Sequence, residues 1–375
     1  MNYFIFPDID TTIYQASGSS NAGLDEILEI RKDMSTSGGN VKVSRILIKF
    51  DLNEISKLVA NGSITNPKYY LNMFDAKSEN LSVSQSLYAY PISGSWLEGQ
   101  GTAHDDPVTL EGASWQYRDG VTQKSFWSGS SGENEGGAWY TSSFASQSFE
   151  YETSDMRMDV TPIVNKWLDG DFPNNGFIVK RSGSYENQDI NTDEGSKDRL
   201  GNFKFFSRQT HTIYPPKLEV EWYDTRWSTG SLSALSSTEL EELSFYMKNL
   251  RPEYKEKSKV KFRVVGRAKY PTKSYSNTAS EYLTVKYLPS GSIGNIGGDG
   301  AYYSVKDTQT EDVIIPYGTG SLISCDSTGN YFNLWMNGLQ SERYYKFEFK
   351  VVSGSSTAEE TVQYYDDDFV FKVVR

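Results

Sequence analysis

The chain has 375 residues, a net charge of −12 and an aromatic content of 14%. This length exceeds what one hydrophobic core usually organises, and the aromatic content argues against disorder, so we expect more than one folded, β-rich domain. No apolar run approaches the roughly 20 residues of a membrane helix, which argues against an integral membrane protein. A single cysteine, Cys325, excludes an internal disulfide and a thiolate zinc cluster.

The charge is unevenly distributed. Residues 1–225 contain 19 Lys and Arg against 31 Asp and Glu, a balance of −12, whereas residues 226–375 contain 18 of each. An acidic surface repels phosphate backbones, so we expect no nucleic-acid binding through the first part. The opening MNYFIFPDIDTTIY has neither the basic nor the apolar segment of a secretory signal, so we expect a protein made and used without export.

Alternating apolar and polar residues predict half-buried strands along most of the chain. The clearest examples are 45–52 (RILIKFDL), 217–224 (KLEVEWYD) and 344–352 (YYKFEFKVV). Helical spacing occurs at 159–170 (DVTPIVNKWLDG), where Asp159 can cap a short helix, and a second short helix is predicted at 52–62. Residues 92–155, rich in Gly, Ser and Trp, are predicted to form ordered loops over a sheet. The alternation is typical of sandwiches, and the fold class is therefore all-β.

A small, polar stretch at 226–238 (RWSTGSLSALSST) is predicted to link two domains, 1–225 and 239–375. The second domain has roughly six or seven strand patterns, which is near the content of an immunoglobulin-like β-sandwich.

The first domain also carries a series of ordered motifs. They are an Asp-Thr strand at 10–14, R-x-L-I-x-F-D-L at 45–52, W-x-E-G at 96–99, D-V-T-x-x-V-x-x-W at 159–167, N-N-G-F-x-x-K at 174–180, F-x-S-R at 205–208 and P-x-L-x-V at 216–220. In this order they resemble the DNRLRE family of domains, which are similar to carbohydrate-binding modules. The resemblance implies a jelly-roll-like sandwich with one short helix. The D-N-R-L-R-E string itself is absent, since residues 198–208 read DRLGNFKFFSR.

Two stretches of the second domain, LRPEYKEKSKVKFRVVGR (250–267) and STGNYFNLWMNGLQSERYYKFEFKV (327–351), resemble a terminal domain of structural proteins of tailed bacteriophages. This resemblance implies a virion component that is made in the host cytoplasm.

Catalytic chemistry has little support in the sequence. Asp105 and Asp106 beside His104 are the one place where a histidine adjoins two acids, but GTAHDDPV also reads as a turn before a proline. Nucleophile-elbow, zinc-protease and P-loop spacings do not occur, so we expect no enzyme.

The sequence offers candidate residues for three kinds of binding: of calcium, of a sugar and of a neighbouring subunit. Oxygen ligands cluster at Asp169, Asp171, Asn174 and Asn175, and Asp8 and Asp10 form a second pair; either group would suit calcium, although helix-to-strand turns favour the same residues. Four loop tryptophans could stack on sugar rings or could anchor the loops by burial: Trp96, Trp115, Trp127 and Trp139.

A basic row is predicted along one strand of the second domain, formed by Lys255, Lys257, Lys259, Lys261 and Arg263. It could guard a sheet edge against aggregation, or it could contact the acidic first domain of a neighbouring copy and build a homo-oligomer. Cys325 is expected to be buried packing.

The function that the sequence favours is a non-enzymatic virion structural protein of a tailed bacteriophage, at the neck, tail or capsid surface, with other virion proteins as partners. The alternative is a carbohydrate-binding adhesin or module that recognises a surface glycan.

Overall fold

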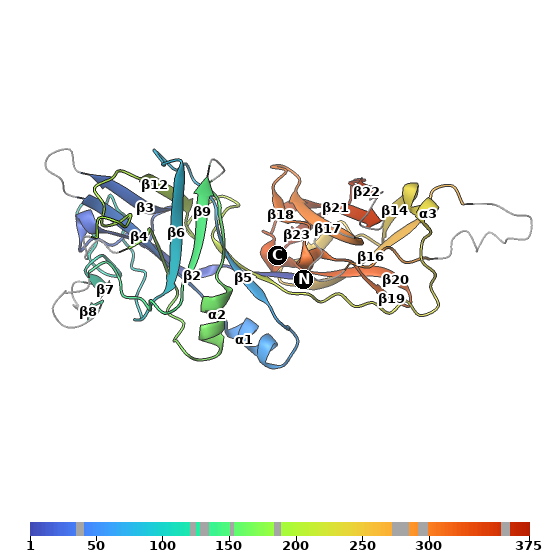
Figure 1. Cartoon of the computed structure of the whole chain (residues 1–375), viewed down its shortest axis with the longest axis horizontal. Coiled ribbons are helices and arrows are strands. Elements are labelled where there is room, and N and C mark those ends of the chain that lie inside the picture. The colour runs from blue at the N-terminus through green and yellow to red at the C-terminus, as the bar shows by residue number, and fades with distance from the viewer. Residues whose placement is uncertain are drawn as a thin grey trace, which may run out of the picture. The chain divides into compact units, whose positions relative to one another are not determined.

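The computed structural model describes residues 1–34, 41–120, 125–127, 135–150, 154–183, 189–271, 285–291, 299–353 and 361–375. The chain forms two compact units. The N-terminal unit contains Ile5–Asn61 and Lys68–Val220, and the C-terminal unit contains Met1–Phe4, Gly62–Pro67 and Glu221–Arg375. Strands dominate both units, which confirms the predicted all-β class (Figure 1). The jelly-roll-like and immunoglobulin-like topologies stay predictions. Within the described ranges, no helix has the length and apolarity needed to cross a membrane.

The chain up to residue 221 forms the strands and helices of the N-terminal unit, together with β1, most of which belongs to the C-terminal unit. Its elements are β1 (Asn2–Ile5), β2 (Pro7–Tyr14), β3 (Ile27–Met34), β4 (Val41–Phe50), α1 (Asn53–Ala60), β5 (Lys68–Met73), β6 (Ser84–Pro91), β7 (Tyr117–Asp119), β8 (Ser125–Phe126), β9 (Ala145–Glu150), β10 (Met156–Asp159), α2 (Thr161–Leu168), β11 (Phe177–Lys180), β12 (Gly201–Phe206) and β13 (Lys217–Glu221). One sheet has the order β12-β3-β4-β11-β6-β9, with β2 also paired to β4, and in a second sheet β13, β5 and β10 follow in that order.

Both predicted helices are confirmed. The N-cap residue of α2 is Val160, and Asp159, the predicted cap, lies one residue earlier and accepts a hydrogen bond from the backbone N–H of Thr161 at 3.0 Å. The helix buries Trp167, whose ring centroid lies 4.6 Å from that of Phe177 in β11. Between α2 and β11, Gly176 adopts φ +90°, and a Cβ at this position would lie 2.4 Å from the carbonyl oxygen of Ile48 in β4. The N-N-G turn therefore needs glycine for both its backbone conformation and its close approach to β4.

The alternation in β4 predicts one dry face, and Ile46, Ile48 and Phe50 are fully buried as expected. Leu47, on the other face, is also buried because it packs with loop residues that include Trp96. Loop residues around Trp96 thus cover part of this sheet, as the sequence predicts, but residues 145–150 of the same stretch form strand β9 of the sheet and are not a loop.

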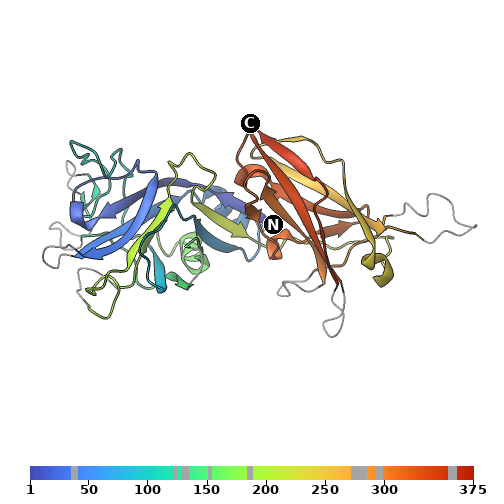
Figure 2. The same cartoon turned by 90° about the horizontal axis from the view of Figure 1, so that it is seen from above.

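The C-terminal unit consists of two sheets that pack around an aromatic core, and its strands can be followed from above in Figure 2. Its elements are α3 (Ser237–Glu241), β14 (Leu243–Lys248), β15 (Glu253–Lys255), β16 (Lys259–Ala268), β17 (Gly300–Asp307), β18 (Val313–Ile315), β19 (Ser324–Asp326), β20 (Gly329–Trp335), β21 (Arg343–Ser353), β22 (Thr361–Tyr365) and β23 (Val370–Val374). The sheets have the orders β14-β16-β20-β19 and β15-β23-β21-β17-β18, with β22 paired to β21.

The two sheets meet face to face through large rings. Phe262 of β16 and Phe332 of β20 lie 4.9 and 5.3 Å, between ring centroids, from Phe347 of β21. Aromatic pairs at these distances add to the free energy gained by burying their area. This sandwich-like packing explains the high Phe and Tyr content of the sequence.

Residues 226–238, predicted as a linker, lie in the C-terminal unit and are tied into it. Trp227 forms a β-bridge with Cys325, and Ala234 forms one with Tyr287. Leu235 is buried in the aromatic core. The segment consists mostly of small, polar residues, but its backbone pairs with other parts of the C-terminal unit and does not form a separate linker.

Candidate functional site

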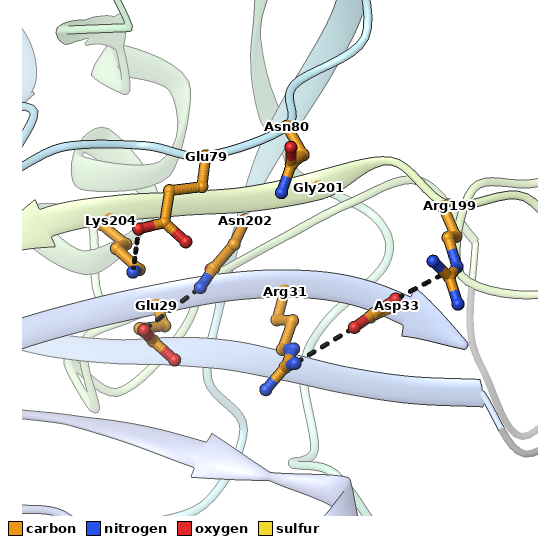
Figure 3. Close-up of a pocket in the computed structure, with 9 residues that line it drawn as sticks. All are labelled: Glu29, Arg31, Asp33, Glu79, Asn80, Arg199, Gly201, Asn202 and Lys204. Atoms are coloured by element: carbon orange, nitrogen blue, oxygen red, sulfur yellow. Dashed lines mark hydrogen bonds and ion pairs between the residues drawn. The ribbon is translucent and has the colours of Figure 1, made fainter. Parts of the chain in front are cut away.

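Two adjoining hollows lie over strands β3 and β12 of the N-terminal unit. Their volumes are about 490 and 480 Å³, and Glu29, Arg31 and Lys204 line both of them. We call the combined surface the β3/β12 groove. The first hollow is completed by Asp33, Glu79, Asn80, Arg199, Gly201 and Asn202, and Figure 3 shows these residues over the two strands.

Strand periodicity places the polar side chains in the groove. In β3, Leu28 and Ile30 are fully buried, while Glu29 and Arg31 point away from the core. Asn202 of β12 pairs in register with Arg31. Because successive residues of a strand face opposite sides, each strand gives the groove one row of polar groups.

The charged groups of the first hollow are mutually paired. Asp33 accepts contacts from Arg31 at 3.1 Å and from Arg199 at 3.4 Å, and Lys204 Nζ lies 3.0 Å from Glu79 Oε1 (Figure 3). Asn202 donates to Glu29 at 3.1 Å, while the buried amide oxygen of Asn202 has no hydrogen-bond partner among the residues that the structure describes. The walls therefore present fixed donors and acceptors of both signs.

The second hollow adds Tyr14, Asp25 and His104 to the groove. The Tyr14 hydroxyl donates to Glu29 at 3.3 Å, and burial, with the nearby Glu29 charge, raises the pKa of Tyr14. Burial likewise raises the pKa of Asp25, although the backbone N–H of Ala103 donates to both its carboxylate oxygens. This arrangement can bind a polar ligand through many directional hydrogen bonds.

Several motif residues that lie far apart in the sequence meet near β2. Asp10 accepts a hydrogen bond from the backbone N–H of Arg208 at 2.8 Å, and Glu98 receives both contacts of the Arg208 guanidinium, at 2.8 and 2.9 Å. Glu98 also accepts from the backbone N–H of Asp10 at 3.1 Å. The Asp-Thr strand, the W-x-E-G turn and the F-x-S-R stretch are thus joined by one ionic network, whose role is to hold these segments together.

Asp10 is the unusual member of this network. Its side chain is 1% exposed, and its Oδ1 atom has no hydrogen-bond partner among the described residues. Burial raises the pKa of Asp10 to about 7, against the lowering effect of the Arg208 backbone hydrogen bond. No group of three or more His, Cys, Asp or Glu suited to a metal ion occurs in the described ranges. Asp8, the other half of the predicted pair, is exposed.

The loop tryptophans are core residues of the loops. Trp96, Trp115 and Trp127 are 5%, 1% and 4% exposed, and Trp139 is half-buried beside them. The Trp96 indole donates to the carbonyl of Asn175, and the Trp127 indole donates to that of Ser114, each at 2.8 Å. The first three rings are closed to a sugar, so the loop-anchoring interpretation describes them.

The oxygen-rich turn after α2 is occupied by protein contacts. Asp171 forms an ion pair with Lys166 at 2.6 Å, and Asn174 donates to the carbonyl of Phe50 at 2.9 Å. Asn174 Oδ1 also accepts from the Gly176 N–H, while Asp169 is the C-cap residue of α2 and Asn175 donates to the Ile92 carbonyl. These side chains close the helix-to-strand turn, the alternative that the sequence left open.

Asp105 has a comparable local role. It accepts hydrogen bonds from the side chain and backbone of Thr102 and from the Thr109 hydroxyl, and these bonds lower its pKa. Asp106 is exposed, and His104 lines the second hollow of the groove. The three residues therefore lie in one turn but do not form a common catalytic site.

The predicted basic row does not lie on one strand. Lys255 ends β15, Lys257 adopts φ +58° in the turn, and only Lys259, Lys261 and Arg263 alternate along β16. The reason is a reversal between β15 and β16, which the uninterrupted alternation of lysines hides. Asp326 forms ion pairs with Lys261 at 2.8 Å and Arg263 at 2.7 Å, so part of the row is neutralised within the chain.

The sequence interpretation missed the β3/β12 groove. Part of the signal was present, because Glu29, Arg31 and Asp33 alternate in EILEIRKD, and Asn202 and Lys204 alternate in GNFKFF. Their convergence depends on the antiparallel pairing of β3 with β12, about 170 residues later in the chain.

A scan against models of known protein families finds no match, and a search of curated proteins finds no significant relative.

Proposed function

We propose that this chain is a non-enzymatic structural protein of a tailed-bacteriophage particle, which acts by burying surface against neighbouring virion proteins. The resemblance of its C-terminal stretches to phage structural proteins supports the proposal. The observation that carries it is a sheet face in the C-terminal unit, formed by β17, β18, β21, β22 and β23, which exposes large apolar side chains beside a covered part around Tyr302 and Val352.

This face carries large apolar side chains in the open. Tyr364 is 65% exposed, and the others are Val313, Tyr344, Val362 and Val370. Strand register brings them onto one side of the sheet. Lys346 of β21 pairs with Val370 of β23 and with Lys306 of β17, and Lys306 in turn pairs with Val313 of β18. Lys350 of β21 pairs with Tyr364 of β22. We call this surface the open sheet face. Clustered exposed apolar groups are typical of protein–protein contact sites.

The polar residues between them fit the same role. Glu348 forms ion pairs with Lys306 at 2.7 Å and Lys346 at 3.8 Å, so charge on the face is largely paired. A neutralised, mixed face can be buried at lower desolvation cost than one with isolated charges.

The test replaces Tyr364 with Glu and Val370 with Asp in the full chain. Because both side chains are exposed, the fold should persist, which the thermal unfolding midpoint will report. We expect the doubly substituted chain to be lost from purified particles. Tyr270→Glu is the matched control, since Tyr270 is 72% exposed and lies off this face. Normal incorporation of the doubly substituted chain would refute the proposal.

A second function, recognition of a surface glycan, is favoured by the β3/β12 groove. Its donors and acceptors are held in place by one another, as a hydroxyl-rich ligand requires. The buried rings of Trp96, Trp115 and Trp127 do not support this function. Glycan-array binding by the wild type that is lost in Arg31→Gln/Lys204→Gln, but kept in the exposed control Lys68→Gln, would establish it.

A further inference from the structure

A small hollow on the C-terminal unit gathers basic side chains from two segments. Its volume is about 320 Å³, and Arg226, Lys259 and Lys261 line it. Arg226 follows the end of β13, while the two lysines belong to β16. Neutral donors at its wall are Ser63 and Asn333.

The two lysines share one face because they are two residues apart on a strand. Their register partners on β20 are Trp335 and Asn333, so rings and ammonium groups alternate over this surface. Lys261 Nζ lies 3.7 Å from the ring centroid of Tyr331, and Lys259 Nζ lies 5.2 Å from that of Trp335. A cation–π contact holds the Lys259 ammonium group without neutralising it, whereas Lys261 also has the Asp326 carboxylate at 2.8 Å.

The carboxylates nearby do not balance this charge. Asp224, in the wall, forms an ion pair with the Met1 amino group at 3.0 Å. Asp326 is shared between Lys261 and Arg263. Within the described part of the chain, Arg226 and Lys259 form no ion pair, so the hollow has surplus positive charge.

We propose that this hollow binds one oxyanion, a carboxylate or a phosphate, through Arg226, Lys259 and Lys261. Guanidinium and ammonium groups form their strongest hydrogen bonds with such anions, and the Asn333 amide can complete the shell. The volume of about 320 Å³ is large enough for such an anion. An acidic side chain of a protein partner and free phosphate share this chemistry.

The experiment is a titration of the full chain, followed by NMR chemical shifts of the backbone amides. The probes are inorganic phosphate and a hexaglutamate peptide, and chloride at matched ionic strength controls for screening. We expect saturable shifts confined to residues around β16 and β20. Arg226→Gln/Lys259→Gln should weaken binding at least about tenfold, since it removes two charged donors. Lys255→Gln, an exposed lysine on β15, is the matched control and should bind as the wild type does.

The two probes separate the sources. Tighter binding of the peptide than of phosphate assigns the hollow to a protein carboxylate, and the reverse assigns it to free phosphate. Shifts that match those caused by chloride, or that persist unchanged in Arg226→Gln/Lys259→Gln, would overturn the proposal. Neither result depends on the open sheet face, so the proposal of anion binding and the proposal of a particle protein can each be refuted without the other.

Discussion

The guanidinium of Arg45 and the carboxylate of Glu194, 149 residues apart in the chain, form a fully buried, two-pronged ion pair with contacts of 3.1 and 2.5 Å. Lys180 adds a third contact to Glu194 at 3.3 Å, and Arg45 lies 4.6 Å from the Trp115 ring centroid. Burial opposes the charge on Glu194, but Arg45 and Lys180 hold its pKa below the usual range. Two basic residues of the R-x-L-I-x-F-D-L and N-N-G-F-x-x-K motifs thus meet at one acid.

Replacing Glu194 with Gln should strongly destabilise the N-terminal unit. The change leaves two buried cations without their counter-ion, which costs about 3–5 kcal/mol of unfolding free energy. Urea unfolding followed by tryptophan fluorescence measures it. Asp171→Asn is the control, because its ion pair is exposed and should contribute little. Equal stability of the Glu194→Gln and wild-type chains would contradict this account.

Asp10 should make the stability depend on pH. Its pKa rises from 3.8 to about 7 in the folded state, so folding takes up a proton between about pH 4 and 7. The contribution of the group is fully present below pH 4 and is lost as the pH rises through 7, by roughly 4 kcal/mol at most. The charges that face it are Glu98 and Arg208.

The measurement compares the unfolding free energies of wild type and Asp10→Asn at pH 5 and pH 8. We expect the stability of the wild type relative to the variant to fall as the pH rises. If both proteins show the same pH dependence, Asp10 is not protonated in the folded chain at pH 5.

Trp115→Ala should cost about 3–5 kcal/mol, because a large side chain that is 1% exposed leaves a cavity under the loops. Leu97→Ala, at a 56% exposed position in the same loops, should change stability by about 0.5 kcal/mol or less. Chemical denaturation of the two variants compares them directly. Similar losses for both would mean that the tryptophan does not anchor the loops.

Cys325 should resist alkylation in the folded chain. The residue is 1% exposed, and burial raises the pKa of its thiol to about 11, so little thiolate is present at pH 8. Mass spectrometry after iodoacetamide treatment should show labelling only in denaturant. Rapid labelling of the native protein would show that β19 opens readily.

Local sequence patterns predicted those strands and helices whose burial pattern follows from their own residue spacing. In β21, Phe347 and Phe349 are buried and Lys346 is partly exposed, as alternation requires. The α2 helix likewise follows from the spacing of Val164 and Trp167 and from the Asp159 side chain.

The candidate sites were harder to predict because they depend on long-range pairing. Glu29 and Asn202 reach the same groove through the pairing of β3 with β12, which no local pattern specifies. The β15–β16 reversal at Lys257 separates lysines that alternate without a break in the sequence. The sequence left open whether the loop tryptophans stack on sugars or anchor the loops, and Trp115 and Trp127 supply the core that loops of this length need.

The central claim, that the chain is part of a phage particle, is tested most directly by locating it there. Particles are purified on a density gradient and labelled with immunogold against the C-terminal unit. The account predicts label at one fixed position on the neck, tail or capsid surface. Particles without the chain, with all of it remaining free in the lysate, would contradict the account and favour glycan recognition through the β3/β12 groove.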